Sequence, residues 1–277
     1  MRILLTGALG FMGQHLHQKL LNLGHQVVPM DKKLGNSTSE NLFPDGKFDF
    51  IVHLGANCSS QISLREPSVD FTDNAIGTFN VCEFSRNNGN IPIIFNSTMK
   101  VYPGEDGIIP PYGTSKLVGE MYLKMYQKVY GVPYVINRPS SVYGPLQDGS
   151  DDGGWVTWFI KASLTDKTIN LYGDGTQSRD ILYIDDCINM IVDQILNFKK
   201  YQNKELDWGG GESNELSLNQ LLNILGYHNV AYKEKLKGDV QRFVVDNTDA
   251  SRINDWRPLT TVSEGIDKTI KWFKNNL

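Results

Sequence analysis

The chain is poor in cysteine and lacks any cysteine pair at metal-ligand spacing. Its 277 residues include only Cys58, Cys82 and Cys187, with no CxxC pair. An odd number of widely spaced cysteines excludes a disulfide framework and a zinc knuckle. We interpret all three as buried or half-buried thiols in a reducing compartment.

Long apolar runs and excess positive charge are also missing. No stretch approaches 18 apolar residues, and the opening MRILLTG is too short for a signal sequence, so we predict no membrane span and a cytoplasmic location. A net charge of -4 without a basic run gives no footprint for nucleic acid or an anionic membrane. His15, His17 and His25 have no further ligand at metal spacing, so we predict no metal.

What is present is a regular alternation of strand and helix patterns. The short β-branched runs RILLTG, QVVPMD, DFIVHLGA, IPIIFNST and PYVINRP alternate with helical patterns at 11–24, 68–88 and 112–131. This alternation predicts an α/β protein with a doubly wound parallel sheet, a Rossmann fold. We assign 1–145 to a dinucleotide-binding domain and 146–277 mainly to a smaller α/β substrate-binding domain, part of which returns to the Rossmann sheet.

Three glycines follow the first predicted strand directly. Gly7 would permit a tight turn, Gly10 a close approach of phosphates, and Gly13 close packing of helix on strand. A helix that starts there directs unpaired backbone N–H groups at a pyrophosphate. Turn and packing glycines without a ligand are the alternative.

An acidic residue ends the second predicted strand. Asp31 lies 18 positions after Gly13 and could accept a hydrogen bond from a ribose 2′-hydroxyl, which favours NAD. Lys32 and Lys33 beside it keep NADP as an alternative.

A tyrosine and a lysine open the helical pattern at 112–131. Tyr112 and Lys116 are four apart and share one helix face, so the lysine charge could lower the pKa of the tyrosine and make it a general base. Thr98 ends the preceding strand, where its hydroxyl could share the hydrogen bond to a substrate alcohol. A β-branched residue that caps a turn is the alternative for Thr98.

These segments together carry a family resemblance. TGALGFMG, HLGA, NAIGTFNV, STMKVY, YGTSK and RPSSVYGP, in this order, resemble the extended short-chain dehydrogenase/reductase family of nucleotide-sugar epimerases and dehydratases. GDGTQSRDILYIDD and the closing DWRPLTTVSEGIDKTIKWF extend the resemblance over nearly the whole chain. Within the family, STMKVY, RPSSVYG, GGWVTWF and GTQSRDIL most resemble the CDP-paratose 2-epimerases.

The resemblance implies roles for individual residues. The catalytic trio would be Thr98, Tyr112 and Lys116. The cofactor contacts that the resemblance implies are Gly7, Gly10, Phe11, Met12, Gly13, Asp31, Lys32, Leu54, Gly55, Ala56, Asn74, Ser97, Tyr112, Lys116 and Pro139. The substrate contacts that it implies are Thr98, Lys100, Ser141, Tyr172, Arg179 and Arg242. Arg179 suits a diphosphate because a guanidinium binds phosphate oxygens in two places.

The residues after Thr98 discriminate between reactions. The family's 4,6-dehydratases carry an Asp-Glu pair there, whereas this chain has Met99 and Lys100, which cannot supply that acid and base. We therefore expect an NAD-dependent epimerase acting at C2 or C4 of the hexose of a nucleotide-diphosphate sugar. The alternatives are an NAD(P)H-dependent reductase of a keto nucleotide sugar and a non-catalytic dinucleotide-binding protein.

The chain departs from the family pattern in three places. Residues 32–48 are too few for the usual helix and strand, and only fourteen positions separate Thr98 from Tyr112. Leu236 stands where the family usually has a second diphosphate arginine, so Lys235, Lys237 or Arg242 would have to compensate.

Two further predictions concern packing. A stripe of Tyr122, Tyr126 and Tyr130 follows helical spacing and is interpreted as a packing face, shared with a second subunit if the family's helical dimer interface is kept. We therefore expect a homodimer. His53 is interpreted as a packed, hydrogen-bonded histidine.

Overall fold

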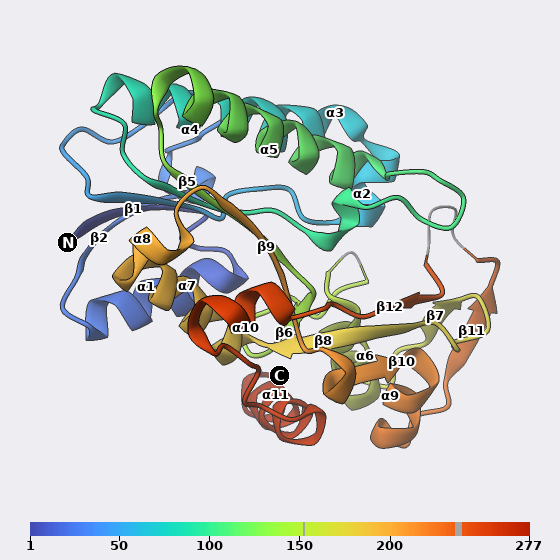
Figure 1. The fold of residues 1–277 in the computed structure, drawn as a ribbon. Helices are drawn as coiled ribbons and strands as arrows, with labels where there is room; N and C mark the ends of the chain where they lie inside the picture. Colours follow the sequence, from blue (N-terminus) through green and yellow to red (C-terminus); the bar gives the residue numbers. More distant parts are fainter. Residues whose placement is uncertain (152, 236–239) are drawn as a thin grey trace. The chain divides into compact units, whose positions relative to one another are not determined.

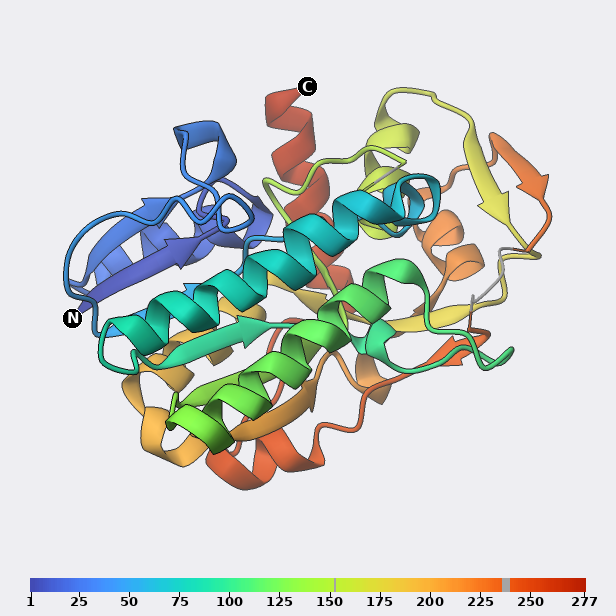
Figure 2. The ribbon, with the colours of Figure 1, turned by 90° about the horizontal axis from the view of Figure 1, so that it is seen from above.

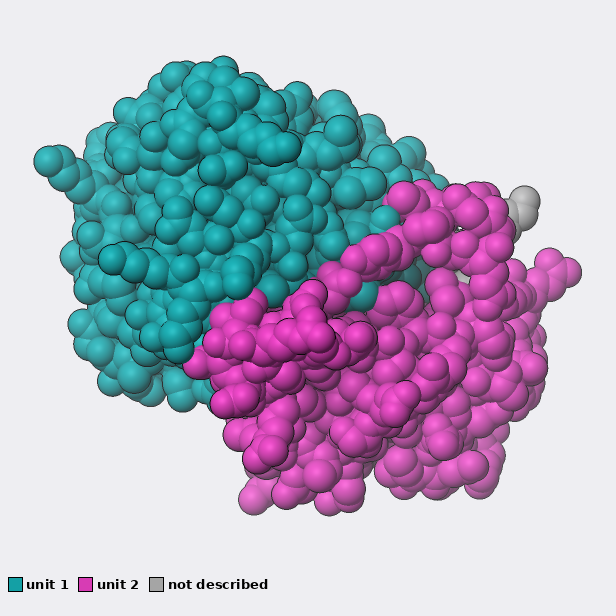
Figure 3. Space-filling view, in the orientation of Figure 1, with its two compact units in different colours: residues 1–101, 110–138, 188–206 teal, residues 102–109, 139–187, 207–277 magenta. Residues whose placement is uncertain are grey.

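A computed structural model describes residues 1–151, 153–235 and 240–277. Unit 1 comprises residues 1–101, 110–138 and 188–206, and unit 2 comprises residues 102–109, 139–187 and 207–277 (Figure 3). Each unit thus consists of several separate stretches of chain, whereas the pattern of the sequence predicts a single boundary after residue 145. In the described part of the chain, no helix combines the length and the apolar character that crossing a membrane requires.

Unit 1 is built on a six-stranded sheet whose order is β2-β1-β3-β4-β5-β9. Its strands are β1 (Arg2–Thr6), β2 (Gln26–Met30), β3 (Phe50–His53), β4 (Ile93–Asn96), β5 (Tyr134–Pro139) and β9 (Lys204–Trp208). The pairs β1/β2, β1/β3, β3/β4 and β4/β5 are parallel. β1 and β4 are buried almost throughout because a parallel sheet is covered on both faces. The predicted doubly wound parallel sheet is confirmed.

Helices cover both faces of this sheet. They are α1 (Phe11–Asn22), α2 (Ser60–Arg65), α3 (Pro67–Asp70), the π-helix η2 (Phe71–Ile76), α4 (Gly77–Asn87), α5 (Pro111–Tyr130), most of α7 (Ile184–Leu196) and α8 (Phe198–Tyr201). Figure 1 shows α4 and α5 over one face and α1, α7 and α8 over the other, and Figure 2 shows α4 and α5 side by side. The helical pattern predicted at 68–88 is observed as α3, η2 and α4, which follow one another directly.

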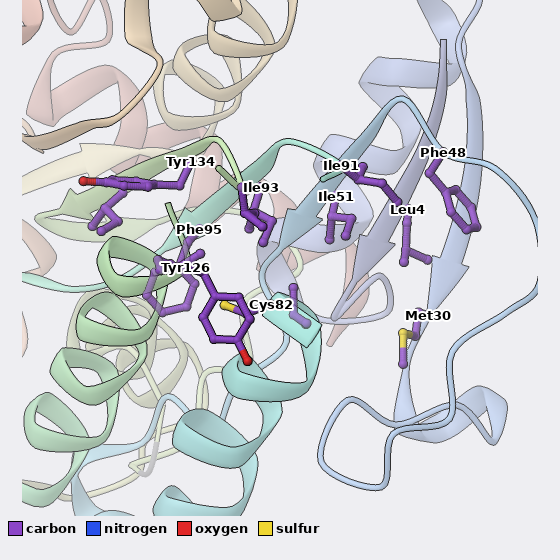
Figure 4. Packing of buried hydrophobic residues seen from close by; sticks show 14 residues of the cluster. Leu4, Met30, Phe48, Ile51, Cys82, Ile91, Ile93, Phe95, Tyr126 and Tyr134 are labelled. Atoms are coloured by element: carbon purple, nitrogen blue, oxygen red, sulfur yellow. The ribbon is translucent and has the colours of Figure 1, made fainter. Parts of the chain in front are cut away.

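The core of unit 1 lies between the sheet and the α4/α5 layer. Its cluster draws Leu4, Ile51, Ile93 and Phe95 from neighbouring strands (Figure 4). Tyr126 reaches the cluster from α5 and is 3% exposed. Fully burying such a side chain stabilises the fold by about 1.5–3 kcal/mol, so this layer holds α5 firmly against the sheet.

The link between β2 and β3 is short. Its only regular element is the 3-10 helix η1 (Lys32–Leu34), so the sheet ends at β2 on this side. β2 and β3 flank β1 on opposite sides, so the chain crosses from one side of β1 to the other between β2 and β3. Ligands of doubly wound sheets bind at the carboxyl ends of the strands where the order reverses in this way.

Unit 2 has shorter strands and its own helices. Its elements are β6 (Ser141–Tyr143), α6 (Trp155–Leu164), β7 (Ile169–Tyr172), β8 (Ser178–Tyr183), η4 (Glu212–Asn214), β10 (Glu215–Ser217), α9 (Leu218–Leu225), β11 (Val230–Lys233), β12 (Arg242–Phe243), α10 (Thr248–Asn254) and α11 (Val262–Asn276). β8 pairs with β6, β10 and β12, and β7 pairs with β11. Capping boxes start α9 and α11, where Ser217 and Thr261 accept from the third residue of their helices.

Candidate functional site

The turn after β1 can be built only with glycine at two positions. Gly7 has φ +67°, and a Cβ there would lie 2.7 Å from the backbone nitrogen of Gly55. A Cβ on Gly13 would lie 2.0 Å from the carbonyl oxygen of Gly7, so this glycine lets α1 pack directly on the turn. Gly10 is the N-cap residue of α1. Because it is a glycine, it has no side chain that could cap the helix. The first turn of α1 is therefore free of a side-chain cap, as an anion site requires.

Asp31 connects the glycine turn to the short helix after β2. Its two carboxylate oxygens accept from the backbone N–H groups of Leu9, at 3.0 Å, and Lys33, at 3.1 Å. Lys32 is ion-paired, with Nζ 2.5 Å from Oδ1 of Asp73. This pairing neutralises a charge that would otherwise favour a 2′-phosphate, so the arrangement fits NAD better than NADP.

The segment after β3 is held by the last residue of β1 and by the π-helix η2. The N–H of Gly55 donates to the hydroxyl of Thr6 at 3.1 Å. Asn74 exchanges two hydrogen bonds with the backbone of Asn57, of 2.8 and 3.0 Å, and is 1% exposed. The predicted cofactor segment, residues 54–56, is thus fixed in place, and the side chain of Asn74 supports it.

The structure brings the predicted trio together in unit 1. Thr98 follows β4, and its hydroxyl accepts from the backbone N–H of Lys100 at 3.2 Å and lies near enough to the phenol of Tyr112 to lower its pKa. Tyr112 lies in the first turn of α5 and is 9% exposed. Lys116, one turn later, is 2% exposed and places Nζ 4.3 Å from the ring centre of Phe95. A hydroxyl, a phenol and an ammonium group therefore meet at the carboxyl edge of the sheet.

Burial dominates the ionisation of this trio. It raises the pKa of Tyr112 well above its usual value, Asp70 and Cys58 act in the same direction, and the hydrogen bond from Thr98 opposes them. Burial also lowers the pKa of Lys116 to about 8, against the influence of Cys58 and Asp70. The expectation that the pKa of Tyr112 lies below its ordinary value is therefore wrong for the polypeptide itself, because desolvation raises it.

A buried ion pair behind the trio was not foreseen from the sequence. Glu120, which is fully buried, receives hydrogen bonds from Ser97, at 2.5 Å, and from two nitrogens of Arg138. Arg138 also contacts Glu205 at 2.9 Å. The only sequence signal was that Glu120 follows Lys116 by four positions and so shares its helix face. The hydroxyl of Ser97, a predicted cofactor contact, is thus bonded to Glu120.

His53 is packed and hydrogen-bonded, as predicted. Its two ring nitrogens contact the hydroxyls of Thr6, at 2.7 Å, and Thr78, at 3.1 Å. Burial and the nearby Lys116 lower its pKa to about 3, so it stays neutral and does not serve as an acid or base. Among the described residues, no group of three or more His, Cys, Asp or Glu side chains could hold a metal ion.

The two predicted diphosphate arginines lie in unit 2 on neighbouring strands. In the register of β12 with β8, Arg242 is opposite Ser178 and Phe243 is opposite Arg179. Since successive residues of a strand point to opposite faces, Arg179 and Arg242 lie on opposite faces of this sheet. Arg242 makes two hydrogen bonds, of 2.9 and 2.8 Å, to Glu215 and is 56% exposed. The structure therefore does not bring the two arginines to one ligand.

The remaining predicted contacts, Phe11, Met12 and Pro139 for the cofactor and Lys100, Ser141 and Tyr172 for the substrate, lie on separate elements. Pro139 ends β5, Ser141 begins β6 and Tyr172 ends β7, and the last two are half-buried. Lys100 lies in the 3-10 helix η3 (Met99–Val101) and is exposed. Phe11 and Met12 open α1 in unit 1.

Of the two lysines expected to replace a second diphosphate arginine, Lys235 is described by the structure. Leu236 and Lys237 lie outside the described residues. Lys235 lies 3.7 Å from a carboxylate oxygen of Glu105, so its charge is partly compensated. Glu105 belongs to the short loop between Thr98 and α5 and also accepts from the backbone N–H of Gln241 at 3.0 Å.

Comparison with known proteins decides the family. The model of the NAD dependent epimerase/dehydratase family matches residues 3–205. This chain belongs to that family. It is 31% identical to a UDP-glucose 4-epimerase of Mycolicibacterium smegmatis, over 99% of each chain. It is 27% identical to the CDP-paratose 2-epimerase of Salmonella typhi, over 98% of this chain and 99% of the relative.

A solved structure shows the same fold. The UDP-glucuronic acid 4-epimerase of Bacillus cereus, in complex with UDP-glucuronic acid and NAD, has a TM-score of 0.87 and 28% identity, with both chains covered in full. The family resemblance, the Rossmann-type fold and NAD as the cofactor are thereby confirmed. The uncapped start of α1 and the position of Asp31 fit that cofactor.

Proposed function

We propose that this protein is an NAD-dependent nucleotide-sugar epimerase that inverts C2 or C4 of the hexose through a transient keto sugar. The observation that carries the proposal is that Tyr112 and Lys116 lie buried one turn apart on α5, with the half-buried Thr98 near the phenol of Tyr112. Met99 and Lys100 follow Thr98 and cannot provide the acid and base of a dehydratase. The trio thus contains the groups needed for proton transfer during oxidation and reduction of the sugar. It lacks the acid and base needed to eliminate water.

Tyr112 is assigned as the acid and base of both half-reactions. Its phenolate oxygen would take the proton of the sugar hydroxyl while the hydroxyl of Thr98 shares the hydrogen bond to that oxygen. NAD, when bound, accepts the hydride from the same carbon and returns it to the opposite face after the keto sugar has turned. Tyr112 would then give the proton back, so that neither protons nor electrons are gained or lost overall.

Lys116 supplies the positive charge that this role requires. With a pKa of about 8 it is mostly protonated at neutral pH, and its ammonium group favours the ionised form of Tyr112. Since burial raises the pKa of Tyr112, that charge must offset desolvation when the base is formed. We assign to Lys116 the further role of holding the nicotinamide ribose.

We assign the substrate side to unit 2. Arg179 is half-buried on β8, and we assign it to the diphosphate, with Ser141 and Tyr172 as further contacts. The relatives named above act on UDP- or CDP-linked sugars, which supports a nucleotide-diphosphate sugar as the substrate class. Arg242 is bound to Glu215 and contributes at most weakly.

The first experiment identifies the cofactor and the reaction together. The purified protein is denatured and any released dinucleotide is identified by mass, and the native protein is incubated with CDP-, UDP-, GDP- and dTDP-sugars in deuterated water. We expect released NAD and one sugar inverted at one carbon without deuterium there. Turnover only with added NADPH would instead show a reductase, and bound NAD without conversion of any sugar would show a non-catalytic protein.

We further propose a cytoplasmic homodimer formed through α5. Met121, Met125 and Val129 repeat every four residues along this helix and are 61%, 37% and 62% exposed. Tyr126 of the predicted tyrosine stripe is buried in the core of unit 1, so the exposed stripe lies one residue earlier on the helix. An exposed apolar helix face supports a contact with a second copy.

Light scattering after size exclusion tests the dimer. We expect twice the chain mass of 31.2 kDa for the native protein and the chain mass itself for Met121→Asp. Leu259→Asp changes a residue of unit 2 that is 71% exposed and should leave the dimer intact. A native protein that elutes as a monomer at micromolar concentration would contradict this proposal.

A further inference from the structure

A buried carboxylate lies close to the trio without a complete set of partners. Asp70 ends α3 and is 1% exposed. Its Oδ1 accepts from the side-chain amide of Asn57 at 2.6 Å. Within the described ranges, its Oδ2 is buried and has no hydrogen-bond partner. Burying a carboxylate oxygen in this way costs stability, so its retention calls for a functional reason.

Asp70 is connected to the start of the catalytic helix by side-chain amides. Asn57, its partner, exchanges two hydrogen bonds with Asn74, and the amide of Asn74 donates to the hydroxyl of Ser115 at 2.9 Å. Ser115 in turn donates to the backbone carbonyl of Tyr112 at 2.8 Å. Asn74 lies in the π-helix η2, a rare form that is common at functional sites. The chain of contacts fixes the segment after β3 against the first turn of α5.

The charged groups around Asp70 come from three elements. Lys116 and Tyr112 lie on α5, which packs against α3, Cys58 lies in the segment after β3, and Asp73 lies in η2; each interacts electrostatically with Asp70. Lys116 is the only cation among these four. A negative charge at Asp70 therefore favours the protonated form of Lys116 and opposes ionisation of Tyr112 and Cys58.

Two further groups act on Lys116. Glu120, on the same helix, also favours its protonated form, and it is bonded to Ser97 and Arg138. His53 is neutral and adds no charge. Asp70 is thus distinct from Glu120 in having no cationic hydrogen-bond partner among the described residues.

We propose that Asp70 is a positioning residue of the epimerase site, which holds the segment 54–60 against α5 through Asn57 and supplies a buried negative charge at the face where α3 packs on the helix of Lys116. This inference rests on the proposed function for its role in turnover. Asp70 touches neither the sugar nor the cofactor in this assignment and acts through Lys116 and the loop. Its effect is therefore expected in the pH dependence of the site.

Cys58 offers a test that needs no catalytic activity. It is exposed, whereas Cys82 and Cys187 are buried, so it should be the reactive thiol of the chain. Surrounding protein atoms still desolvate its sulfur and raise the thiol pKa, Asp70 raises it further and Lys116 lowers it. The rate of alkylation by iodoacetamide against pH, read at the Cys58 peptide by mass spectrometry, therefore reports the charge at Asp70.

The expected result is a shift to lower pH when that charge is removed. Asp70→Asn keeps the shape of the side chain and should lower the midpoint of Cys58 alkylation by about one pH unit. The matched control is Glu66→Gln, which removes a carboxylate from an exposed position four residues earlier. Identical midpoints for native protein and Asp70→Asn, or an unreactive Cys58, would overturn the proposal.

Turnover gives the second readout. Removing the charge at Asp70 makes both Tyr112 and Lys116 lose their protons at lower pH, so both limbs of the kcat profile should shift to lower pH by about one unit with KM changed less than about two-fold. A merely structural role would lower activity at all pH values without moving the limbs, and that result would also overturn the proposal. If the native protein converts no sugar at all, the proposed function fails, while the thiol titration still decides the placement of charge.

Discussion

The two units hold their candidate site residues in different ways. In unit 1, Lys116 is 2% exposed and Tyr112 9% exposed, on a helix packed against a six-stranded sheet. In unit 2, Arg242 is 56% exposed and bound to Glu215 on a two-residue strand. The groups that we propose carry the chemistry are thus fixed by a core, whereas the groups proposed to meet the substrate lie on shorter strands and loops.

The largest expected effect is on the core-held group of unit 1. Tyr112→Phe removes the proton acceptor and should lower kcat by about 10²–10⁴, with bound NAD retained because the glycine turn is untouched. Single-turnover kinetics measure the loss of rate, and the mass of the dinucleotide released on denaturation shows whether NAD is retained. Tyr130→Phe, at the exposed end of the same helix, is the control and should keep native turnover. Full activity in Tyr112→Phe would contradict the assignment of Tyr112 as the acid and base.

The smallest expected effects are on unit 2, and they separate its two arginines. Arg179→Gln should raise KM about ten-fold or more with little change in kcat, because a diphosphate contact is made equally in ground and transition states. Arg242→Gln should change KM less than about two-fold, since this arginine is bound to Glu215 on the opposite face of the sheet. Initial rates against sugar concentration measure both. Equal effects at the two positions would show that they share a ligand after all.

The positions of helices and strands were predicted best where the local residues and the spacing of buried apolar residues favour the same structure. The glycine turn, α1 and the first turn of α5 were placed within two residues because Gly13, Pro111 and the apolar spacing all favour the same local structure. The parallel sheet followed from strands that are apolar on both faces. The short link at 32–48 was also recognised correctly as lacking the usual helix and strand, and it contains only η1.

Prediction failed where long-range partners decide the state of a side chain. The pKa of Tyr112 depends on burial under segments that are distant in sequence. Lys32 is paired with Asp73, 41 residues away, and Arg242 with Glu215, 27 residues away. The helix and strand periodicities of the sequence carry no information about ion pairs between residues so far apart in the chain. Glu120 and Asp70 were missed for the same reason.

The family and the parallel sheet could be read from the sequence, and the trio could be proposed from it, because glycine positions, helix spacing and apolar runs are local properties of the chain. Which of those side chains are desolvated, which charges are already paired, and that the helix of Asp70 packs against that of Lys116 became visible only in the folded chain. Desolvation and charge pairing depend on atoms brought together from distant segments, and they set the chemistry that the trio can perform.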